Sequence, residues 1–390
     1  TPPPPPPPPP GIYSSAASDV YKRQVETWVK IEEYPPTSSF YLSYKQHSVE
    51  PWFSWQFMVT DWGDPFYFEI RTTDSNYGSC GSNTAPNTTG WYHVVGVYEH
   101  DQALKIYVNG VEDTAWTSGT GPTGNVMDSD GNLSTGWDVK GIQDEFRISK
   151  VARSAAWIET EYNNQKSPAA FYTVGIEESY GTTADPFHNG WQYNKKITIL
   201  ASEVAADLTN FPVLIKTTDP DWREDDSYGG NVAQPDGGDI LFIAGDGHTK
   251  LDHEIERYDE TTGELVAWVE VPNLSGSADT GLYIYYGNTT LAAGDNQWNV
   301  NGTWDEDGSE NYKAVWHLHE SSGTQIGDST SYGNTGTKLS ATEPNPAAGQ
   351  LAGAQYFDGT NDFITINNSS GVGHVLDFTA GPFTLSAWFN

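Results

Sequence analysis

The chain has 390 residues, of which 19 are Lys or Arg and 52 are Asp or Glu, giving a formal net charge of −33. Such a field repels nucleic acid phosphates and anionic membranes, so we expect neither as a partner. No apolar run approaches the ~20 residues that span a bilayer, and a single cysteine, Cys80, excludes an intrachain disulfide and a cysteine-based zinc site.

Short alternating runs of apolar and polar residues dominate the chain, with 39 glycines and 24 prolines among them. This pattern favours an all-β fold of antiparallel β-sandwiches over helix bundles or parallel α/β sheets. The length predicts roughly two to three domains. We therefore divide the chain into modules.

The first 24 residues stand apart. Nine consecutive prolines, Pro2 to Pro10, precede GIYSSAASDVYKRQ, which lacks the basic start and apolar stretch of a signal peptide. A polyproline II ligand is one interpretation. We favour a low-complexity leader that is not native, because SSAASDVYKRQ resembles tails that recur on translated environmental assemblies.

The two ends of the chain carry pieces of one repeat. VETWVKI at Val25 to Ile31 has the pattern of TLSAWFN at Thr384 to Asn390, and Trp28 and Trp388 stand at equivalent positions. We therefore expect a fragment of a longer repeat protein, in which the first copy lacks its beginning and the second lacks most of its end.

The first module is predicted at 25–178. Its candidate strands are Phe40 to Lys45, Ser54 to Thr60, Phe66 to Arg71, Trp91 to Tyr98, Ala103 to Asn109 and Ile142 to Ser149. The run GWYHVVGVYEHDQALKIYVNG predicts a hairpin. Ser154 is expected to cap a helix whose Trp157, Ile158 and Tyr162 pack on the sandwich, and a strand near Phe171 to Val174 is expected to close the module.

These residues resemble a known family. GWYHVVGVYEHDQALKIYVNG and VKGIQDEFRISKVARSAAWIETEYNNQ look like the C-terminal two thirds of a concanavalin A-like, laminin-G-like jelly roll. The resemblance implies a two-sheet antiparallel sandwich of a kind used for glycan and protein recognition, often with calcium, and sometimes for glycoside hydrolysis. The fold alone does not decide among these.

The middle module is predicted at 188–287. WQYNKKITI, LTNFPVLIK, GGDILFIAGDGHTKLDHEIERYD, TGELVAWVEVP and TGLYIYYGN resemble the bacterial domain of unknown function 2341, which implies a companion of jelly rolls without known chemistry. We expect the first and middle modules to be antiparallel sandwiches with separate cores, and 288–313 to be a linker.

From residue 314 the jelly-roll family returns. AVWHLHESSGTQIGDSTSYGNTGT and AGAQYFDGTNDFITI resemble the opening of a second laminin-G-like module, 314–390. A sandwich that lacks its first strands exposes unpaired edges. We therefore hypothesise that this segment docks onto the first module, with the FDGTNDFITI strand pairing beside it. The alternative is that each copy completes itself in the full protein.

Asp252, Glu254 and Glu256 alternate in KLDHEIERYD, so a regular strand would project all three from one face. The spacing is superficially that of jelly-roll glycosidases, but the order of residue types differs and no motif places a second carboxylate opposite. We expect a solvent face opposite Leu251 and Ile255, and no catalysis.

A calcium site would need six to eight oxygen ligands. The donors that match the family are Asp144, Glu145, Asp328, Asn334, Asp358, Asn361 and Asp362. The alternative is that these residues cap turns. His317 and His319 are expected to lie on one strand face, which we interpret as packing or a solvated edge rather than zinc.

Exposed aromatic planes can stack on the C–H faces of sugars. Trp52, Trp55 and Trp62 in VEPWFSWQFMVTDWGD are the candidates for ligand contact, whereas Trp28, Trp91, Trp268 and Trp388 are expected in cores.

The modules together predict binding or adhesion without catalysis, in an extracellular or cell-surface bacterial protein. The expected partner is a polysaccharide or surface glycan. One alternative is an accessory module of a polysaccharide-degrading enzyme whose catalytic domain lies outside this chain, and another is a structural spacer. Converging carboxylates in a cleft would indicate catalysis, and an open aromatic or calcium-lined surface would indicate binding.

Overall fold

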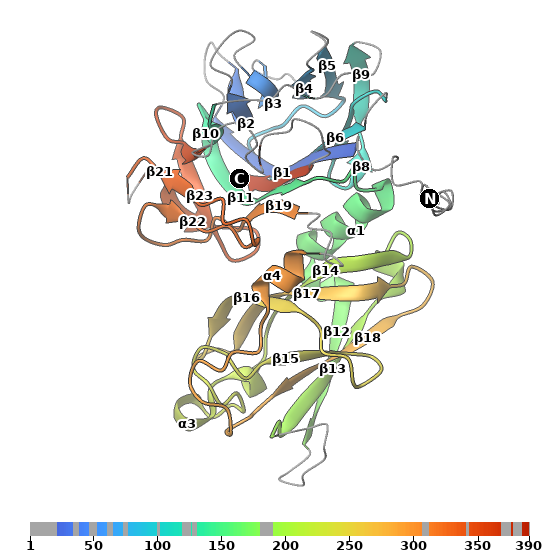
Figure 1. Cartoon of the computed structure of the whole chain (residues 1–390), viewed down its shortest axis with the longest axis vertical. Coiled ribbons are helices and arrows are strands. Elements are labelled where there is room, and N and C mark those ends of the chain that lie inside the picture. The colour runs from blue at the N-terminus through green and yellow to red at the C-terminus, as the bar shows by residue number, and fades with distance from the viewer. Residues whose placement is uncertain are drawn as a thin grey trace, which may run out of the picture.

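Strands build most of the computed structural model of the chain, in two bodies (Figure 1). The structure describes residues 22–33, 39–46, 53–60, 65–72, 77–99, 102–118, 126, 131–179, 190–305, 312–340, 343–367, 376 and 384–389. We call residues 22–149 with 312–389 the upper domain and residues 168–305 the lower domain. The fold is all-β, as predicted.

The upper domain is a sandwich of two nine-stranded sheets. Sheet 1 runs in the order β22 (Asn345–Ala348), β23 (Gly353–Asp358), β11 (Lys140–Ser149), β1 (Lys22–Glu33), β25 (Thr384–Phe389), β6 (Tyr92–Glu99), β7 (Lys105–Val108) and β8 (Val111–Glu112), and β19 (Tyr312–Trp316) also pairs with β11. The predicted hairpin of VVGVYEHDQALKIYV is confirmed, because β6 and β7 pair directly.

Sheet 2 covers the other side of the core. Its order is β20 (Gln325–Ile326), β21 (Gly336–Lys338), β24 (Ile364–Ile366), β10 (Leu133–Trp137), β2 (Phe40–Gln46), β3 (Phe53–Val59), β4 (Phe66–Arg71), β5 (Tyr77–Ser82) and β9 (Thr114–Ser118). Alternation places Phe66, Phe68 and Ile70 in the buried core, so β4 turns its other residues outward.

The C-terminal segment completes this sandwich, which confirms the docking hypothesis. β23 pairs with β11 through Tyr356 and Ile142, and β24 pairs with β10 through Ile366 and Leu133. The Trp316 ring stacks on Phe146 with their centroids 5.2 Å apart. Edges of β10 and β11 that would otherwise be open are thereby paired.

The two copies of the repeated strand are neighbours in sheet 1, and each also pairs with β11 and β6. Trp28 of β1 and Trp388 of β25 both lie opposite Asp144 on β11. On the other side, Val29 and Phe389 both lie opposite Tyr92 on β6. The repeat read from the sequence is therefore also a repeat in register. β1 begins at Lys22, so three residues assigned to the leader belong to a strand.

The lower domain is a second, smaller antiparallel sandwich. Sheet 3 has the order β12 (Tyr172–Ser179), β13 (Tyr193–Ile199), β18 (Thr280–Tyr286) and β15 (Leu241–Ala244), and sheet 4 has the order β14 (Leu208–Thr218), β17 (Glu264–Leu274) and β16 (His253–Asp259). Its core is a hydrophobic cluster separate from that of the upper domain, as predicted.

The predicted end of the first module was wrong. β12 was expected to close the upper sandwich, but it pairs with β13 from Tyr172 opposite Ile199 onward. Phe171 and Trp157 likewise belong to the lower core, where the Trp157 ring lies 4.8 Å from Phe211. Because both sandwiches offer an apolar face, periodicity alone cannot say which one a strand joins.

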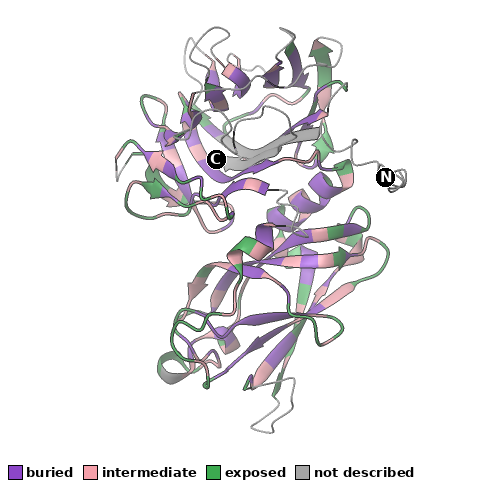
Figure 2. Ribbon diagram, in the orientation of Figure 1, coloured by how far each residue is buried: buried purple, intermediate pink, exposed green. Residues whose placement is uncertain are grey.

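Helix α1 (Ala155–Lys166) lies between the two domains (Figures 1 and 2). Ser154 caps it as predicted, accepting a hydrogen bond from the Trp157 amide at 3.2 Å. On one side of the helix, Ile158 packs with Val95 and Val97 of the upper domain. On the other side, the Asn164 side chain bonds both backbone groups of Leu214.

The remaining helices are short. They are α2 (Pro168–Phe171), α3 (Asp225–Tyr228) and α4 (Val300–Trp304), with 3-10 turns at Ala201–Glu203 and Pro220–Trp222. α4 lies in the predicted linker, and its Trp304 joins a third apolar cluster with Trp268 of β17 and Tyr312 of β19. Elements of both domains therefore meet in one buried seam.

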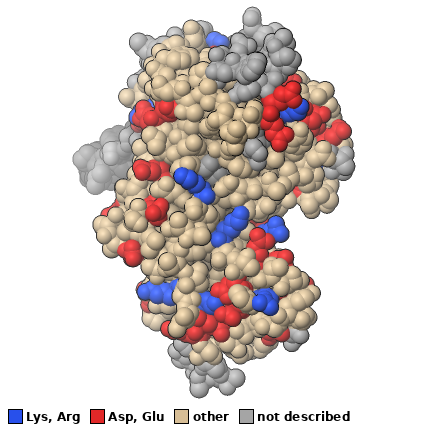
Figure 3. All heavy atoms as spheres, turned by 180° about the vertical axis from the view of Figure 1, so that it is seen from behind, with Lys and Arg blue, Asp and Glu red and all other residues tan. Residues whose placement is uncertain are grey.

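Charged side chains on the face drawn in Figure 3 are spread over both domains rather than gathered in one patch. On the face drawn in Figure 3, Asp and Glu form several separate groups on both domains, with few Lys and Arg between them. Among the described residues, no helix has the length and apolar character to cross a bilayer.

Candidate functional site

A pocket lined by aromatic rings opens on the outer face of sheet 2. Its lining residues come from three adjacent strands and are Tyr41, Tyr44, Gln46, Phe53, Gln56 and Trp137, around a cavity of about 220 Å³. The opposite faces of β2 and β3 carry Phe40, Leu42 and Phe57 into the core. The pocket therefore uses the solvent side of the sandwich.

A β-bulge brings the two tyrosines together. Residues three apart on a regular strand point to opposite faces, but the register of β2 on β3 shifts between Tyr41 and Ser43. Tyr41 and Tyr44 consequently share the outer face, with ring centroids 5.3 Å apart. The sequence offered no signal for this bulge, so the pocket was missed.

Trp137 forms one wall of the pocket. It is 39% exposed, and its ring meets Tyr44 edge-on at 6.4 Å between centroids. On its other side Phe363 of the C-terminal segment lies 5.1 Å away, so docking of that segment helps to set the Trp137 ring.

Polar groups of β4 lie next to the aromatic rings. Gln56 donates to Glu69 at 3.4 Å, and Arg71 pairs with Glu69 at 2.6 Å while its guanidinium lies over the Phe53 ring. Burial, with the charges of Asp138 and Glu69, raises the pKa of Tyr41 above its usual value, so its hydroxyl is neutral. The pocket thus combines aromatic faces with neutral hydrogen-bonding groups.

Of the three predicted tryptophans the structure describes only Trp55, which does not line this pocket. Trp55 is wholly buried in the upper core, which rules out the ligand contact expected of it. It lies on the inward side of β3, the side opposite Gln56 of the pocket. Trp52 and Trp62 lie outside the described residues.

Three of the seven predicted calcium ligands accept backbone amides at turns. Asp328 accepts the amides of Val315, Thr330 and Asn334, and Asp358 accepts that of Thr360. Asp362 accepts the amide of Asp358. These contacts match the turn-capping alternative. Asn361 is exposed at the same turn.

Asp144 and Glu145 of β11 are buried between the domains rather than in a surface loop. Asp144 Oδ2 accepts the amides of Gln350 and Leu351. Both Glu145 oxygens are taken, one by His317 Nδ1 at 2.7 Å and the other by Arg147 at 2.7 Å. This arrangement is not an oxygen-only calcium loop.

The carboxylates of β16 contradict the expected solvent face. Glu254 is only 7% exposed and the Glu256 side chain is fully buried. Trp304 donates to Glu254 at 2.6 Å and Trp268 donates to Glu256 at 2.9 Å. α4 and the C-terminal segment cover this face, and nothing in the alternation of the strand reveals such a cover. Asp252, the third of the run, accepts from the side-chain amide of Asn299.

His317 connects the carboxylates of the two domains. Its Nδ1 contacts Glu145, and its Nε2 lies 3.1 Å from Glu254 Oε2. A carboxylate therefore does lie opposite the β16 residues, which corrects the expectation that none would. Burial lowers the pKa of His317, but the charges of Glu145, Glu254 and Glu256 outweigh it and hold that pKa well above its ordinary value.

Arg147 is the second buried cation of this junction. It pairs with Glu145 and, at 2.8 Å, with Glu161 of α1, and its guanidinium lies 4.2 Å from the centre of the Trp268 ring. The charges of Glu145 and Glu161 outweigh burial and raise its pKa. The junction between the domains is thus a buried ionic network.

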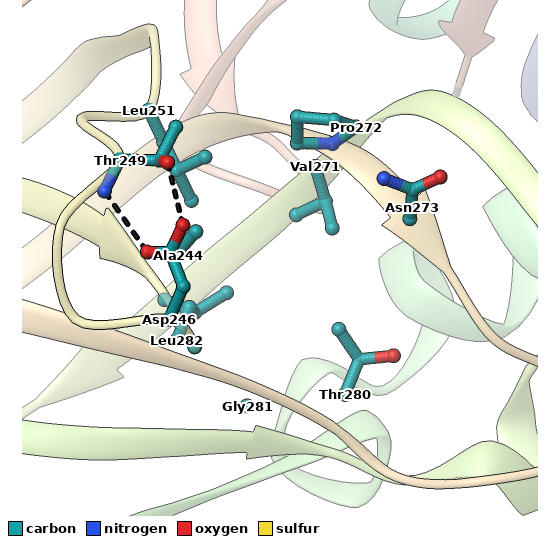
Figure 4. Close-up of a pocket in the computed structure, with 11 residues that line it drawn as sticks. Ala244, Asp246, Thr249, Leu251, Val271, Pro272, Asn273, Thr280, Gly281 and Leu282 are labelled. Carbon is teal, nitrogen blue, oxygen red and sulfur yellow. Dashed lines mark hydrogen bonds between the residues drawn. The ribbon is translucent and has the colours of Figure 1, made fainter.

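A second pocket opens between the sheets of the lower domain (Figure 4). Its cavity is about 230 Å³, with Leu251, Val271 and Leu282 among its walls. Asp246 at its edge is engaged by Thr249, whose backbone amide and hydroxyl both donate to it. Among the described residues that line it there is no aromatic ring, so it offers no stacking surface.

Two family matches agree with this architecture. Residues 24–159 match the family described as "Concanavalin A-like lectin/glucanases superfamily". The chain contains a concanavalin A-like domain. Residues 236–319 match "Domain of unknown function (DUF2341)", in the predicted order. That second match includes β16, α4 and His317, so it extends past the lower domain into the C-terminal segment. None of the curated proteins matches the chain significantly.

Similar solved structures are distant. The binding domain of Paraclostridial Mosquitocidal Protein 1 is 10% identical, with 68% of this chain and 76% of that chain covered and a TM-score of 0.25. The botulinum neurotoxin serotype C1 binding domain is 8% identical, with 71% and 82% covered and a TM-score of 0.21. The serotype D ligand binding domain, in complex with N-acetylneuraminic acid, is 13% identical, with 70% and 83% covered and a TM-score of 0.19. Values this low assign no ligand to this chain.

Proposed function

We propose that the chain is a non-catalytic carbohydrate-binding module of an extracellular bacterial protein, with its ligand in the aromatic pocket of sheet 2. The observation that carries this is the convergence of Tyr41, Tyr44, Phe53 and Trp137 with the amides of Gln46 and Gln56. Aromatic faces stack on sugar C–H groups, while neutral amides and hydroxyls exchange hydrogen bonds with sugar hydroxyls.

The size of the pocket limits how large its ligand can be. Its volume of about 220 Å³ is below the roughly 300–1,000 Å³ of sites that enclose drug-sized ligands. It is therefore suited to one sugar unit, with the rest of a polysaccharide lying along the open sheet.

The charge of the chain limits which classes of glycan can bind. A formal net charge of −33 repels polyanions, and the nearby Arg71 is already paired with Glu69. Neutral glycans are therefore favoured over sulfated or sialylated ones. An accessory module of a polysaccharide-degrading enzyme would use the same pocket, so these two proposals differ only in what lies outside this chain.

A glycan array followed by titration calorimetry tests the proposal. Trp137→Ala should weaken binding of a neutral glycan tenfold or more, because it removes the most exposed stacking surface of the pocket. Gln46→Ala, at an exposed position, should weaken binding without disturbing the fold. The matched control is Trp116→Ala, since Trp116 is 43% exposed on the same sheet but lies on β9, outside the pocket.

Each arm is measured with and without added calcium, because calcium binding stays a prediction. Equal affinity in Trp137→Ala, Gln46→Ala and Trp116→Ala would contradict this site. An array on which no neutral glycan binds would leave the structural spacer as the better account.

A further inference from the structure

Four metal-ligating side chains converge where the two domains meet. Glu145 comes from β11, Glu256 from β16, and His317 and His319 from the segment after β19. Donor atoms of Glu145, Glu256 and His317 all lie within 4.8 Å of one another. His319 Nδ1 lies 3.6 Å from Glu256 Oε1.

Glu256 has a buried oxygen without a hydrogen bond. Its side chain is fully buried, and Oε1 accepts from no donor. Most buried polar side-chain atoms in proteins have a hydrogen-bond partner, so such an atom calls for another partner, such as an ion.

The distances around Glu256 fit a shared metal ion. Its Oε2 lies 3.6 Å from His317 Nδ1 and its Oε1 lies 3.6 Å from His319 Nδ1. These separations are too long for hydrogen bonds. Two donor atoms bound to one tetrahedral zinc ion at about 2.1 Å lie about 3.4 Å apart.

We propose that Glu145, Glu256, His317 and His319 form a binding site for a divalent transition metal of the zinc type at the junction of the two domains. Two imidazole nitrogens with two carboxylates are the donor set of zinc, whereas calcium takes oxygen ligands only. The site shares Glu145 with the calcium donors expected from the sequence, but its other three ligands differ from them.

Each buried ligand already has the outer partner that metal ligands need. Glu254 accepts from His317 Nε2, which leaves Nδ1 to face Glu145 and Glu256. Outer carboxylates of this kind fix the orientation of metal-bound histidines. Arg147 holds Glu145 Oε2, and Trp268 holds Glu256 Oε2.

The charge of the junction also favours a cation. Four buried carboxylates lie at this junction, each within 4 Å of Arg147 or His317: Glu145, Glu161, Glu254 and Glu256. Arg147 pairs with two of them, Glu145 and Glu161. A bound divalent cation would offset part of this negative charge.

The backbone shapes this site at three points. Glu256 is the extra residue of a bulge between Ile255 and Arg257, and bulges redirect side chains. Glu145 and Leu318 both have left-handed backbone angles, with φ of 54° and 60°. Leu318 separates the two histidines, whose rings are stacked 5.9 Å apart.

His319 provides the entrance. Its side chain is 37% exposed whereas the side chains of the other three ligands are almost fully buried. A metal ion can therefore reach the site from solvent at His319. Once bound, it would tie the upper domain, the lower domain and the C-terminal segment together.

The test is zinc titration of the full chain after treatment with a chelator. We expect one zinc ion per chain, a higher melting temperature with zinc, and visible absorption of the tetrahedral type when cobalt(II) replaces zinc. His319→Gln should lower zinc affinity tenfold or more and should fold, because the residue is largely outside the core.

The matched control is His248→Gln, which removes an exposed imidazole from a lower-domain loop. It should bind zinc as the unchanged chain does. Glu256→Gln should abolish the cobalt(II) spectrum. The proposal is overturned by a chain that binds no zinc, or by equal affinities in His319→Gln and His248→Gln.

Discussion

The two domains differ in how far apart in the sequence their strands lie. All strands of the lower domain come from one continuous stretch between Tyr172 and Tyr286, whereas both sheets of the upper domain take strands from residues 22–149 and from 312–389. Local periodicity is therefore enough to describe the lower domain. The upper domain depends on contacts between distant segments, and its stability should depend on them too.

Removing residues 306–390 should produce the largest difference in stability between the two domains. The truncated chain loses β19, β23 and β24, which exposes the edges of β10 and β11 and opens the upper core. We expect the upper domain to lose its cooperative transition in calorimetry while the lower domain keeps its own. Amide exchange would locate the loss, and slow exchange in β2 to β6 of the truncated chain would contradict it.

Arg147→Met should give the next largest effect. The side chain is fully buried between Glu145 and Glu161, and removing one partner of a buried ionic group costs about 3–5 kcal/mol. Urea unfolding measures this change. Arg257→Met is the matched control, because Arg257 pairs with Glu264 near the surface and should cost about 1 kcal/mol or less. Similar losses in the two variants would mean that the network contributes little.

Gly136→Ala tests the docking of the C-terminal segment directly. Gly136 has φ of +84°, and an added Cβ would lie 2.1 Å from the ring of Phe357 on β23. Crowding of a packed core costs about 1–3 kcal/mol. Gly294→Ala has a similar φ of +91° with open space around it, so it measures the backbone term alone. The difference between the two variants is the packing cost, and no difference would show that β23 is loosely held.

Acid should lower the stability of both domains, because each contains a buried histidine. Burial lowers the pKa of His93 on β6 to about 3 and that of His253 on β16 to about 4. A histidine with a lowered pKa stabilises the fold fully above its unfolded value of about 6.5, and this stabilisation is lost as the pH falls toward the folded value. At pH 6, protonation of each histidine in the unfolded state should lower the free energy of unfolding by about 1 kcal/mol relative to pH 8. His93→Gln should remove the acid sensitivity of the upper transition only; an unchanged acid profile in that variant would assign the effect to other groups.

The sequence was a good guide where structure is local. Alternating Val95, Val97, Ile106 and Val108 predicted the β6–β7 hairpin, and Ser154 predicted the start of α1. The repeat at the two ends predicted the docking, because a repeated motif carries information about distant pairing that periodicity lacks.

The candidate sites were less predictable because distant elements create them. Tyr41 and Tyr44 share a face only through a bulge, and Glu254 and Glu256 are buried only because α4 and the C-terminal segment cover them. Neither feature alters the local pattern of residues. The extracellular location and the non-native leader stay predictions.

The smallest effect is expected from deleting β25, although it is a full strand of sheet 1. Thr384–Phe389 and β1 carry the same motif and face the same residues, Asp144 on β11 and Tyr92 on β6. Both β1 and β25 pair with β6 and with β11, so β1 can keep these two strands paired when β25 is absent. We expect a change in melting temperature of about 2 °C or less, since roughly 1 kcal/mol shifts a domain of this size by 2–4 °C. Deleting 22–33 instead should also be tolerated, with β25 as the remaining copy, whereas deleting both should unfold the upper domain. A large loss from the β25 deletion alone would show that the two copies are not interchangeable.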